Sequence, residues 1–301
     1  MTNRYVPEPV GSFSLEWIVR ELNRVSYDLE QLHMSGYDFG LEVAKGKVVG
    51  HSKVNKFGRA LDCDSGVKTD IHDGANSSSF PTAALDERDL WVAPTQARVH
   101  AVKSTSTDDD GAPVGVGART IKVYGLTSWD TKEVNETITL DGTTAVNTSN
   151  AYVIIHRMKV LTKGATNINV GTIYATAATD DTITAQINPG EGQTQMAVYG
   201  VSSLETAYLT SYYASAIKFK TAASVSVSLL LNPTPSTEIL NFQVKHTQGL
   251  VTTGSNYIRH EANPPMSFSG PFILKIQADA DSADVDVSAG FDLYIVDNKY
   301  V

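Results

Sequence analysis

The stretch Ser224-Val225-Ser226-Val227-Ser228-Leu229 alternates strictly between polar and apolar side chains. Successive side chains of a β-strand point to opposite faces, so the alternation predicts a strand with one buried face and one face in water. The six residues therefore indicate an antiparallel sheet that covers a core on one side only.

Strand-like runs of the same kind follow one another along most of the chain. They are residues 97–102, 120–124, 134–140, 152–160, 168–176, 182–187, 195–201, 207–217, 224–231, 240–246, 272–278 and 285–296. Turn formers separate them, and Asp141-Gly142 predicts a tight hairpin because both central residues of a type I′ turn need positive φ. Many short antiparallel strands are typical of sandwiches and barrels.

The turn-rich segment 188–193, Asn-Pro-Gly-Glu-Gly-Gln, marks a domain boundary. The sequence thus predicts a mostly β protein with two antiparallel, jelly-roll-like β-sandwich domains. We place the first at residues 50–187 and the second at residues 194–301. We assign residues 1–36 to an N-terminal arm and helix and residues 37–49 to a linker.

Near the N-terminus the apolar period changes to that of a helix. Six apolar residues are spaced alternately by three and four positions, which places them on one stripe. They are Leu15, Ile18, Leu22, Val25, Leu29 and Leu32. Ser14 is the expected N-cap and Gly36 the expected stop. The stripe has a/d spacing but covers fewer than three heptads, so it needs a partner. An anchor or oligomerisation helix is favoured over a helix packed on its own domain.

Composition excludes several classes of protein. The 301 residues carry 24 Lys and Arg against 33 Asp and Glu, a net charge of −9, which argues against nucleic-acid binding. The single cysteine excludes a disulfide framework. No apolar run approaches the roughly 18 residues of a membrane span. The N-terminus lacks the apolar core of a signal peptide, so we expect synthesis in the cytosol without membrane insertion.

Signatures of enzymes and cofactors are missing from the sequence. It has neither a phosphate-binding GxxxxGK[ST] loop nor a GxSxG elbow, and its seven histidines lack the spacing of a metal site. We therefore expect no enzyme and no cofactor. One acidic group lies between two strands and offers hard oxygen ligands for Ca²⁺, although its spacing favours a solvated turn. It consists of Asp279, Asp281, Asp284 and Asp286. A second group, Asp108 to Asp110, is predicted to be a solvated loop tip.

Thirteen tyrosines against three tryptophans give a tyrosine-heavy balance. Alternation predicts that Tyr208 and Tyr212 share one face of a strand and that Tyr213 takes the other. Tyrosine suits interfaces because it buries a large area and keeps a polar tip. The candidates for a subunit interface or a glycan site are Tyr208, Tyr212, Trp91 and Trp129. Ordinary strand residues at the margin of a core are the alternative.

Several segments of the chain together resemble a group of structural proteins of tailed bacteriophages, especially from aquatic environments. The resemblance covers most of the chain from about residue 50. It lies in residues 51–59, 117–126, 136–146, 168–171, 189–194, 255–261 and 290–298. Residues 14–25 also look like the short leading helices of many virion-attached phage proteins. No catalytic residue is implied by this resemblance.

The resemblance implies a virion structural protein, made in the bacterial cytoplasm. The favoured place is the tail, as a fibre, spike or collar appendage that takes part in host attachment. Its expected partners are further copies of itself in a homotrimer, a tail adaptor or nozzle or the capsid, and a host surface glycan. The alternatives are a capsid decoration protein of the head-fibre or cement type, and a glycan-binding module of a different class.

Overall fold

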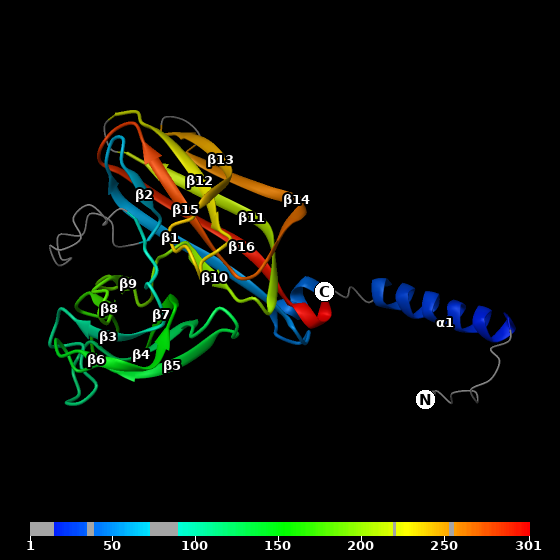
Figure 1. Ribbon diagram of the computed structural model, residues 1–301, viewed down its shortest axis with the longest axis horizontal. Coiled ribbons are helices and arrows are strands. Elements are labelled where there is room, and N and C mark those ends of the chain that lie inside the picture. The colour runs from blue at the N-terminus through cyan, green and yellow to red at the C-terminus, as the bar shows by residue number, and fades with distance from the viewer. Residues whose placement is uncertain (1–14, 35–38, 73–89, 219–220, 253–255) are drawn as a thin grey trace. The chain divides into compact units, whose positions relative to one another are not determined.

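The computed structural model describes residues 15–34, 39–72, 90–218, 221–252 and 256–301, with only the backbone for residues 28–34 and 39 (Figure 1). The chain divides into two units, Met1–Val49 and Gly50–Val301. The first unit holds the predicted helix, α1 (Leu15–Met34), and a short helix, α2 (Phe39–Ala44). The predicted linker of residues 37–49 thus contains a helical turn. Ser14 and Gly36, the expected cap and stop, lie outside the described residues.

The described part of the second unit is almost entirely β, which confirms the predicted fold class. Its strands are β1 (His51–Cys63), β2 (Lys68–Asp70), β3 (Arg98–Ser104), β4 (Ala118–Leu126), β5 (Val134–Thr139), β6 (Val146–Tyr152), β7 (Ile154–Lys163), β8 (Ile173–Ala177), β9 (Ile183–Ile187), β10 (Val198–Val201), β11 (Glu205–Ile217), β12 (Ser224–Asn232), β13 (Gln243–Val251), β14 (Tyr257–Ser269), β15 (Phe272–Ala280) and β16 (Val285–Asp297). A 3₁₀ turn, η2 (Asn298–Tyr300), follows them.

Two antiparallel sheets form a jelly-roll domain from both ends of this unit. One sheet has the order β1-β16-β11-β14 and the other β10-β15-β12-β13, with β2 also paired to β15. Strand β1 lies beside the last strand, β16. From β10 onward each strand lies in the other sheet from the one before it, except that β12 and β13 pair within one sheet, as in a double Greek key. We call residues 50–72 and 197–301 the jelly-roll domain.

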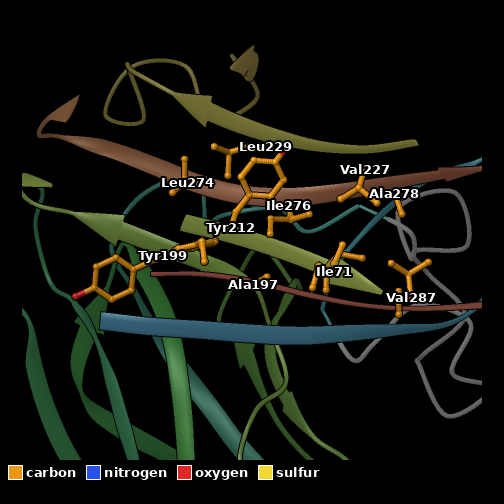
Figure 2. Close-up of a cluster of buried hydrophobic side chains, with 14 of the residues drawn as sticks. Ile71, Ala197, Tyr199, Tyr212, Val227, Leu229, Leu274, Ile276, Ala278 and Val287 are labelled. Atoms are coloured by element: carbon orange, nitrogen blue, oxygen red, sulfur yellow. The ribbon is translucent and has the colours of Figure 1, made fainter. Parts of the chain in front are cut away.

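The core of the jelly-roll domain lies between the two sheets. Val225, Val227 and Leu229 of β12 are buried, whereas Ser224 and Ser226 on the other face are exposed. The alternation that predicted this strand is therefore confirmed. Figure 2 shows Leu229 and Tyr212, from opposite sheets, pointing into the same core.

Residues 90–196 form a second β domain, which we call the inserted domain. Its sheets have the orders β6-β3-β8-β9 and β5-β4-β7, and they enclose a core that includes Trp91, Ile121 and Tyr152. β7 also contacts β9, and β5 contacts β6, so the sheets meet at both margins. The domain lies in the chain between β2 and β10 of the jelly roll (Figure 1).

This insertion differs from the predicted arrangement of two domains in tandem. Residues 51–63 pair with residues 285–296, so the start of the predicted first domain belongs to the jelly roll. Long-range strand pairing leaves no local trace in the sequence, and the prediction placed these residues with their neighbours. The segment 188–193 follows β9, the last strand of the inserted domain, and lies just before the chain returns to the jelly roll at residue 197.

The predicted hairpin at Asp141-Gly142 is wrong in its pairing. Gly142 has a φ of 56°, and the N–H of Thr144 donates to the carbonyl of Asp141 at 2.9 Å, so a tight turn forms. The flanking strands β5 and β6 nevertheless belong to different sheets. The turn therefore carries the chain from one sheet to the other instead of closing a ladder.

Candidate assembly site

The apolar stripe of α1 is the main uncovered apolar feature among the described residues of the first unit. Leu15, Ile18, Leu22 and Val25 have exposed fractions of 76%, 41%, 63% and 47%. No other described segment of that unit covers them. Leu29 and Leu32 continue the stripe along the helix backbone. A helix with such a face gains its stability from packing against a partner.

The remaining faces of α1 carry charges of both signs. They include four acidic residues, Glu16, Glu21, Asp28 and Glu30, and two basic ones, Arg20 and Arg24. Arg24 Nε donates to Glu21 Oε2 at 2.8 Å, one turn apart. The polar side is therefore mildly acidic and partly paired within the helix.

A second candidate surface is the outer face of the four-stranded sheet of the jelly roll. Tyr208 of β11 lies opposite Tyr294 of β16, and Tyr213 lies opposite Gly290. All three tyrosines are half-buried. We call this surface the tyrosine face.

The tyrosine face corrects the predicted orientation of three residues. A β-bulge between Leu209 and Ser211 inserts one extra residue into β11. Side chains beyond the bulge change faces, so Tyr208 and Tyr213 lie outside while Tyr212 is buried inside. Strict alternation had paired Tyr208 with Tyr212 on one face, because nothing in these residues of the sequence indicates a bulge.

The polar groups of the tyrosine face are hydrogen-bonded to one another. Asn55 Nδ2 donates to Asp292 Oδ1 at 2.8 Å, and Ser211 Oγ donates to Asp292 Oδ2 at 2.9 Å. The ring of Tyr213 occupies the space where Gly290 lacks a side chain. The face is thus a fixed surface of rings and satisfied polar groups.

The other predicted aromatic contacts are core residues. Trp91 is buried, and its Nε1 donates to the carbonyl of Thr184 at 2.9 Å. Trp129 is buried against Gly200. Together with the buried Tyr212, they offer no ring face to a glycan, so of the four candidates only Tyr208 remains near a surface.

Tyr212 belongs to a polar cluster that links the two sheets at the β13–β14 edge of the jelly roll. Its hydroxyl is hydrogen-bonded to Nδ1 of His246 on β13, and the His246 ring stacks on His260 of β14 with centroids 4.3 Å apart. Burial raises the pKa of Tyr212 to about 12. Burial and the neighbouring His260 lower the pKa of His246, which favours the neutral imidazole.

Two carboxylates of the candidate Ca²⁺ group accept hydrogen bonds from backbone N–H groups of the protein. Asp281 accepts from the N–H of Ser224 at 2.9 Å and Asp286 accepts from the N–H of Asp62 at 3.1 Å, so these carboxylates cap different turns. The described residues contain no group of three or more side chains placed to hold a metal ion.

Asp109 is wholly buried, which corrects the predicted solvated loop tip. Its carboxylate accepts from the N–H groups of Ala118, Val170 and Gly171 and from Ser104 Oγ, all at 2.7–2.8 Å. The side chain ties its own loop to the first residue of β4 and to the loop that precedes β8. A run of three aspartates gave no sign that the middle one folds inward.

Buried charges lie where the inserted domain meets β1 of the jelly roll. Lys56 is buried and donates to the carbonyl of His156, and burial, together with the charge of Arg157, lowers its pKa to about 7. His156 is also buried, which lowers its pKa, and its Nε2 lies 2.6 Å from Glu133 Oε2. Burial raises the pKa of Glu133, but the His156 hydrogen bond and nearby cations leave it lowered.

A second buried pair lies along the same edge. Lys275 Nζ is 2.5 Å from Asp70 Oδ2, and both side chains are shielded from water. Asp70 also accepts from the N–H of Trp91 at 2.7 Å and from Gln277 Nε2 at 2.9 Å. These contacts join β2, β15 and the first residues of the inserted domain.

These polar clusters stabilise contacts between strands and between the β domains. Among the described residues, the α1 stripe and the tyrosine face are the candidate surfaces for a partner. The spacing of apolar residues revealed the stripe in advance. The sequence predicted only part of the tyrosine face, because Tyr294 pairs with Tyr208 across 86 residues of chain and Gly290 pairs with Tyr213 across 77.

Comparisons with known proteins add little. No family model and no curated protein matches the chain. Two solved structures are similar at 9% identity: the infectious bursal disease virus Gt strain, over 84% of this chain and 74% of that one, with a TM-score of 0.22, and the infectious bursal disease virus VP2 subviral particle, over 82% and 72%, with a TM-score of 0.20. Likenesses at this level do not bear on function.

The described helices include none that is both long and apolar enough to cross a membrane.

Proposed function

We propose that this protein is a structural component of a bacteriophage virion, anchored by α1. The observation that carries the proposal is the contrast between β domains with closed cores and a helix whose apolar stripe is left uncovered by the other described residues of its own unit. A helix with an exposed apolar stripe becomes stable when the stripe packs against a partner. The role is non-enzymatic and needs no cofactor, since assembly depends on surfaces.

The tail is the favoured position, as a fibre, spike or collar appendage attached through α1, with the β domains free to meet the host. A jelly roll supports a virion role, since viral capsid and lectin domains use this architecture, although a fold alone does not assign a function. The sequence resemblance to tailed-phage structural proteins points the same way.

Incorporation into particles tests the proposal. Leu22→Asp places a charge in the exposed apolar stripe, and we expect it to abolish incorporation while both β domains still fold. Tyr27→Asp is the matched control, because Tyr27 is exposed on the opposite face of α1. Normal incorporation of Leu22→Asp would refute the anchor.

Copy number separates the tail from the capsid. A tail component follows the six-fold or twelve-fold ring of the tail, whereas a decoration protein follows capsid symmetry. Quantitative mass spectrometry of purified particles measures this directly. Several hundred copies per particle would replace the tail assignment by capsid decoration.

Glycan binding is a second candidate, favoured by the tyrosine face. Tyr208, Tyr213 and Tyr294 present half-buried rings beside polar groups, which suits stacking against a sugar. Tyr208→Ala should then weaken glycan binding on an array. The glycan hypothesis requires that Tyr208→Ala lose binding without losing thermal stability. Tyr152 is no such contact, because it is buried in the core of the inserted domain.

A further inference from the structure

We propose that the partner of the α1 stripe is the α1 helix of other copies of this chain, in a parallel bundle of three or four helices. This inference rests on the proposed assembly role of α1 and names the partner that covers it. The helix spans 20 residues, or about 30 Å, which is enough for nearly three heptads.

The residue types at the two seam positions point to more than two chains. Position a holds Leu15, Leu22 and Leu29, and position d holds Ile18, Val25 and Leu32. Dimers favour β-branched residues at a and leucine at d, whereas leucine at a with isoleucine at d shifts the preference to trimers and tetramers. Here every a position is leucine and two of the three d positions are β-branched, which is the pattern of the larger bundles.

The width of the apolar face supports the same conclusion. Val19 occupies position e, directly beside the seam, and is 48% exposed. In a two-helix coil such a side chain stays largely in water. In a bundle of three or four, each helix contacts two neighbours, so a wider face is buried.

The charges of α1 argue against a lipid surface as the occupant. Helices that lie in a membrane interface carry a polar face rich in Lys and Arg. The polar faces of α1 instead hold four acidic and two basic side chains. An acidic helix is repelled by anionic headgroups. Another copy of α1 carries the same apolar stripe, so the two stripes can pack against each other.

The mass of the full-length protein in solution gives the first test. Native mass spectrometry or light scattering over a range of concentrations should show three- or four-chain species. Leu22→Asp should reduce these to single chains, and Tyr27→Asp, at position f, should leave them intact. A two-chain species, single chains at every concentration, or an intact assembly of Leu22→Asp would each overturn the inference.

Exchange of the seam residues gives a sharper test. The fourfold variant Leu15→Ile, Ile18→Leu, Leu22→Ile and Val25→Leu keeps the stripe apolar but moves the β-branched residues to a. We expect it to form two-chain species. An unchanged number of chains would show that the seam does not set the stoichiometry and would overturn the inference.

A cysteine at Leu15 tests the orientation. In a parallel bundle the Leu15→Cys residues of different copies share one layer and should form a disulfide on mild oxidation. In an antiparallel one they lie near position 32 of their neighbours, about 25 Å away, which is too far for a disulfide. Cys63 is buried and does not compete. Absence of the cross-link would overturn the parallel arrangement.

These experiments separate the inference from the proposed function. They are performed on purified protein, whereas the virion role is measured by incorporation into particles. If the protein is a single chain in solution but Leu22→Asp still prevents incorporation, the virion role stands and α1 binds a different protein. If chains associate through α1 but Leu22→Asp particles are normal, self-association stands and the anchor is refuted.

Discussion

The two edges of the jelly-roll domain are built in opposite ways. At the β1–β10 edge, Lys56 and Asp70 are buried with hydrogen-bonding partners, and the inserted domain packs against the strands. At the β13–β14 edge, no described residue of β14 is buried, and its inward-facing Ile258 and Met266 are only half-covered.

The β1–β10 edge is thus a rigid contact between the two β domains, whereas the β13–β14 edge is open. A charge that has been removed from water must keep its partners, so the β1–β10 edge holds the two β domains in one arrangement. The outer strands β13 and β14 end their sheets, and Pro264 and Pro265 reduce the donors that β14 offers to another strand. Substitutions at the covered edge should therefore cost stability, and equivalent ones at the open edge should not.

Loss of a buried ion pair should give the largest contrast. Asp70→Ala leaves Lys275 buried without its carboxylate, and we expect unfolding to become easier by about 3–5 kcal/mol. Glu261→Ala removes an exposed partner of Arg259 at the open edge and should change stability by less than about 1 kcal/mol. Urea denaturation measures both. Equal effects would mean that the two edges do not differ.

Two glycines provide the next contrast. A Cβ at Gly58 on β1 would lie 2.7–2.8 Å from backbone atoms of Gln195, Met196 and Ala197, so Gly58→Ala should destabilise by about 1–3 kcal/mol. A Cβ at Gly249 on β13 meets nothing within 4 Å. Gly249→Ala should be neutral or stabilise slightly, since alanine restricts the unfolded chain. Thermal melting of both variants checks this pair, and a tolerated Gly58→Ala would contradict the tight joint.

Lys56 should make the covered edge sensitive to alkaline pH. Its folded pKa of about 7 lies below that of an unfolded lysine, near 10.4, so the unfolded chain binds more protons between these values. Stability should therefore rise from pH 7 toward pH 10, by at most about 1.4 kcal/mol per pH unit. Lys56→Met should remove this rise. Denaturation at pH 7 and pH 9 tests it, and an identical slope in the variant would exclude Lys56 as the source.

The His246–His260 pair should give the smallest effect, at the open edge and in acid. The folded pKa of His246 is lowered, so its contribution is complete above pH 6.5 and is lost as the pH falls through the folded value. Two imidazolium charges about 4 Å apart repel by roughly 1 kcal/mol in water. His260→Phe keeps the stacked ring and should lessen the loss. Melting curves from pH 7 to pH 5 measure it, and an unchanged acid profile in the variant would rule the pair out.

The sequence predicted those parts of the fold that depend on local period. The alternation at Ser224–Leu229 specified a strand with one buried face, and the spacing from Leu15 to Leu32 specified a helix with one apolar stripe. Both are confirmed, because each pattern repeats at the period of the structure it forms. The proposed assembly role rests on the stripe, which the same spacing predicted.

Features that depend on distant residues were missed or misplaced. The bulge in β11 reversed the faces of Tyr212 and Tyr213, and Asp109 folded inward to meet backbone donors that lie up to 62 residues away. Trp91 and Trp129 entered cores instead of a surface. In each case the deciding partner lies far along the chain, where no short motif records it.

The sequence by itself therefore determined the kinds of element, the helix with one apolar stripe and the class of mostly β protein. Only the tertiary structure decided that β1 closes onto β16, that one β domain is inserted into the other, and which tyrosines reach the surface. The physical reason is that period fixes the conformation of a segment, whereas pairing between sheets is selected by the total burial that the whole chain achieves.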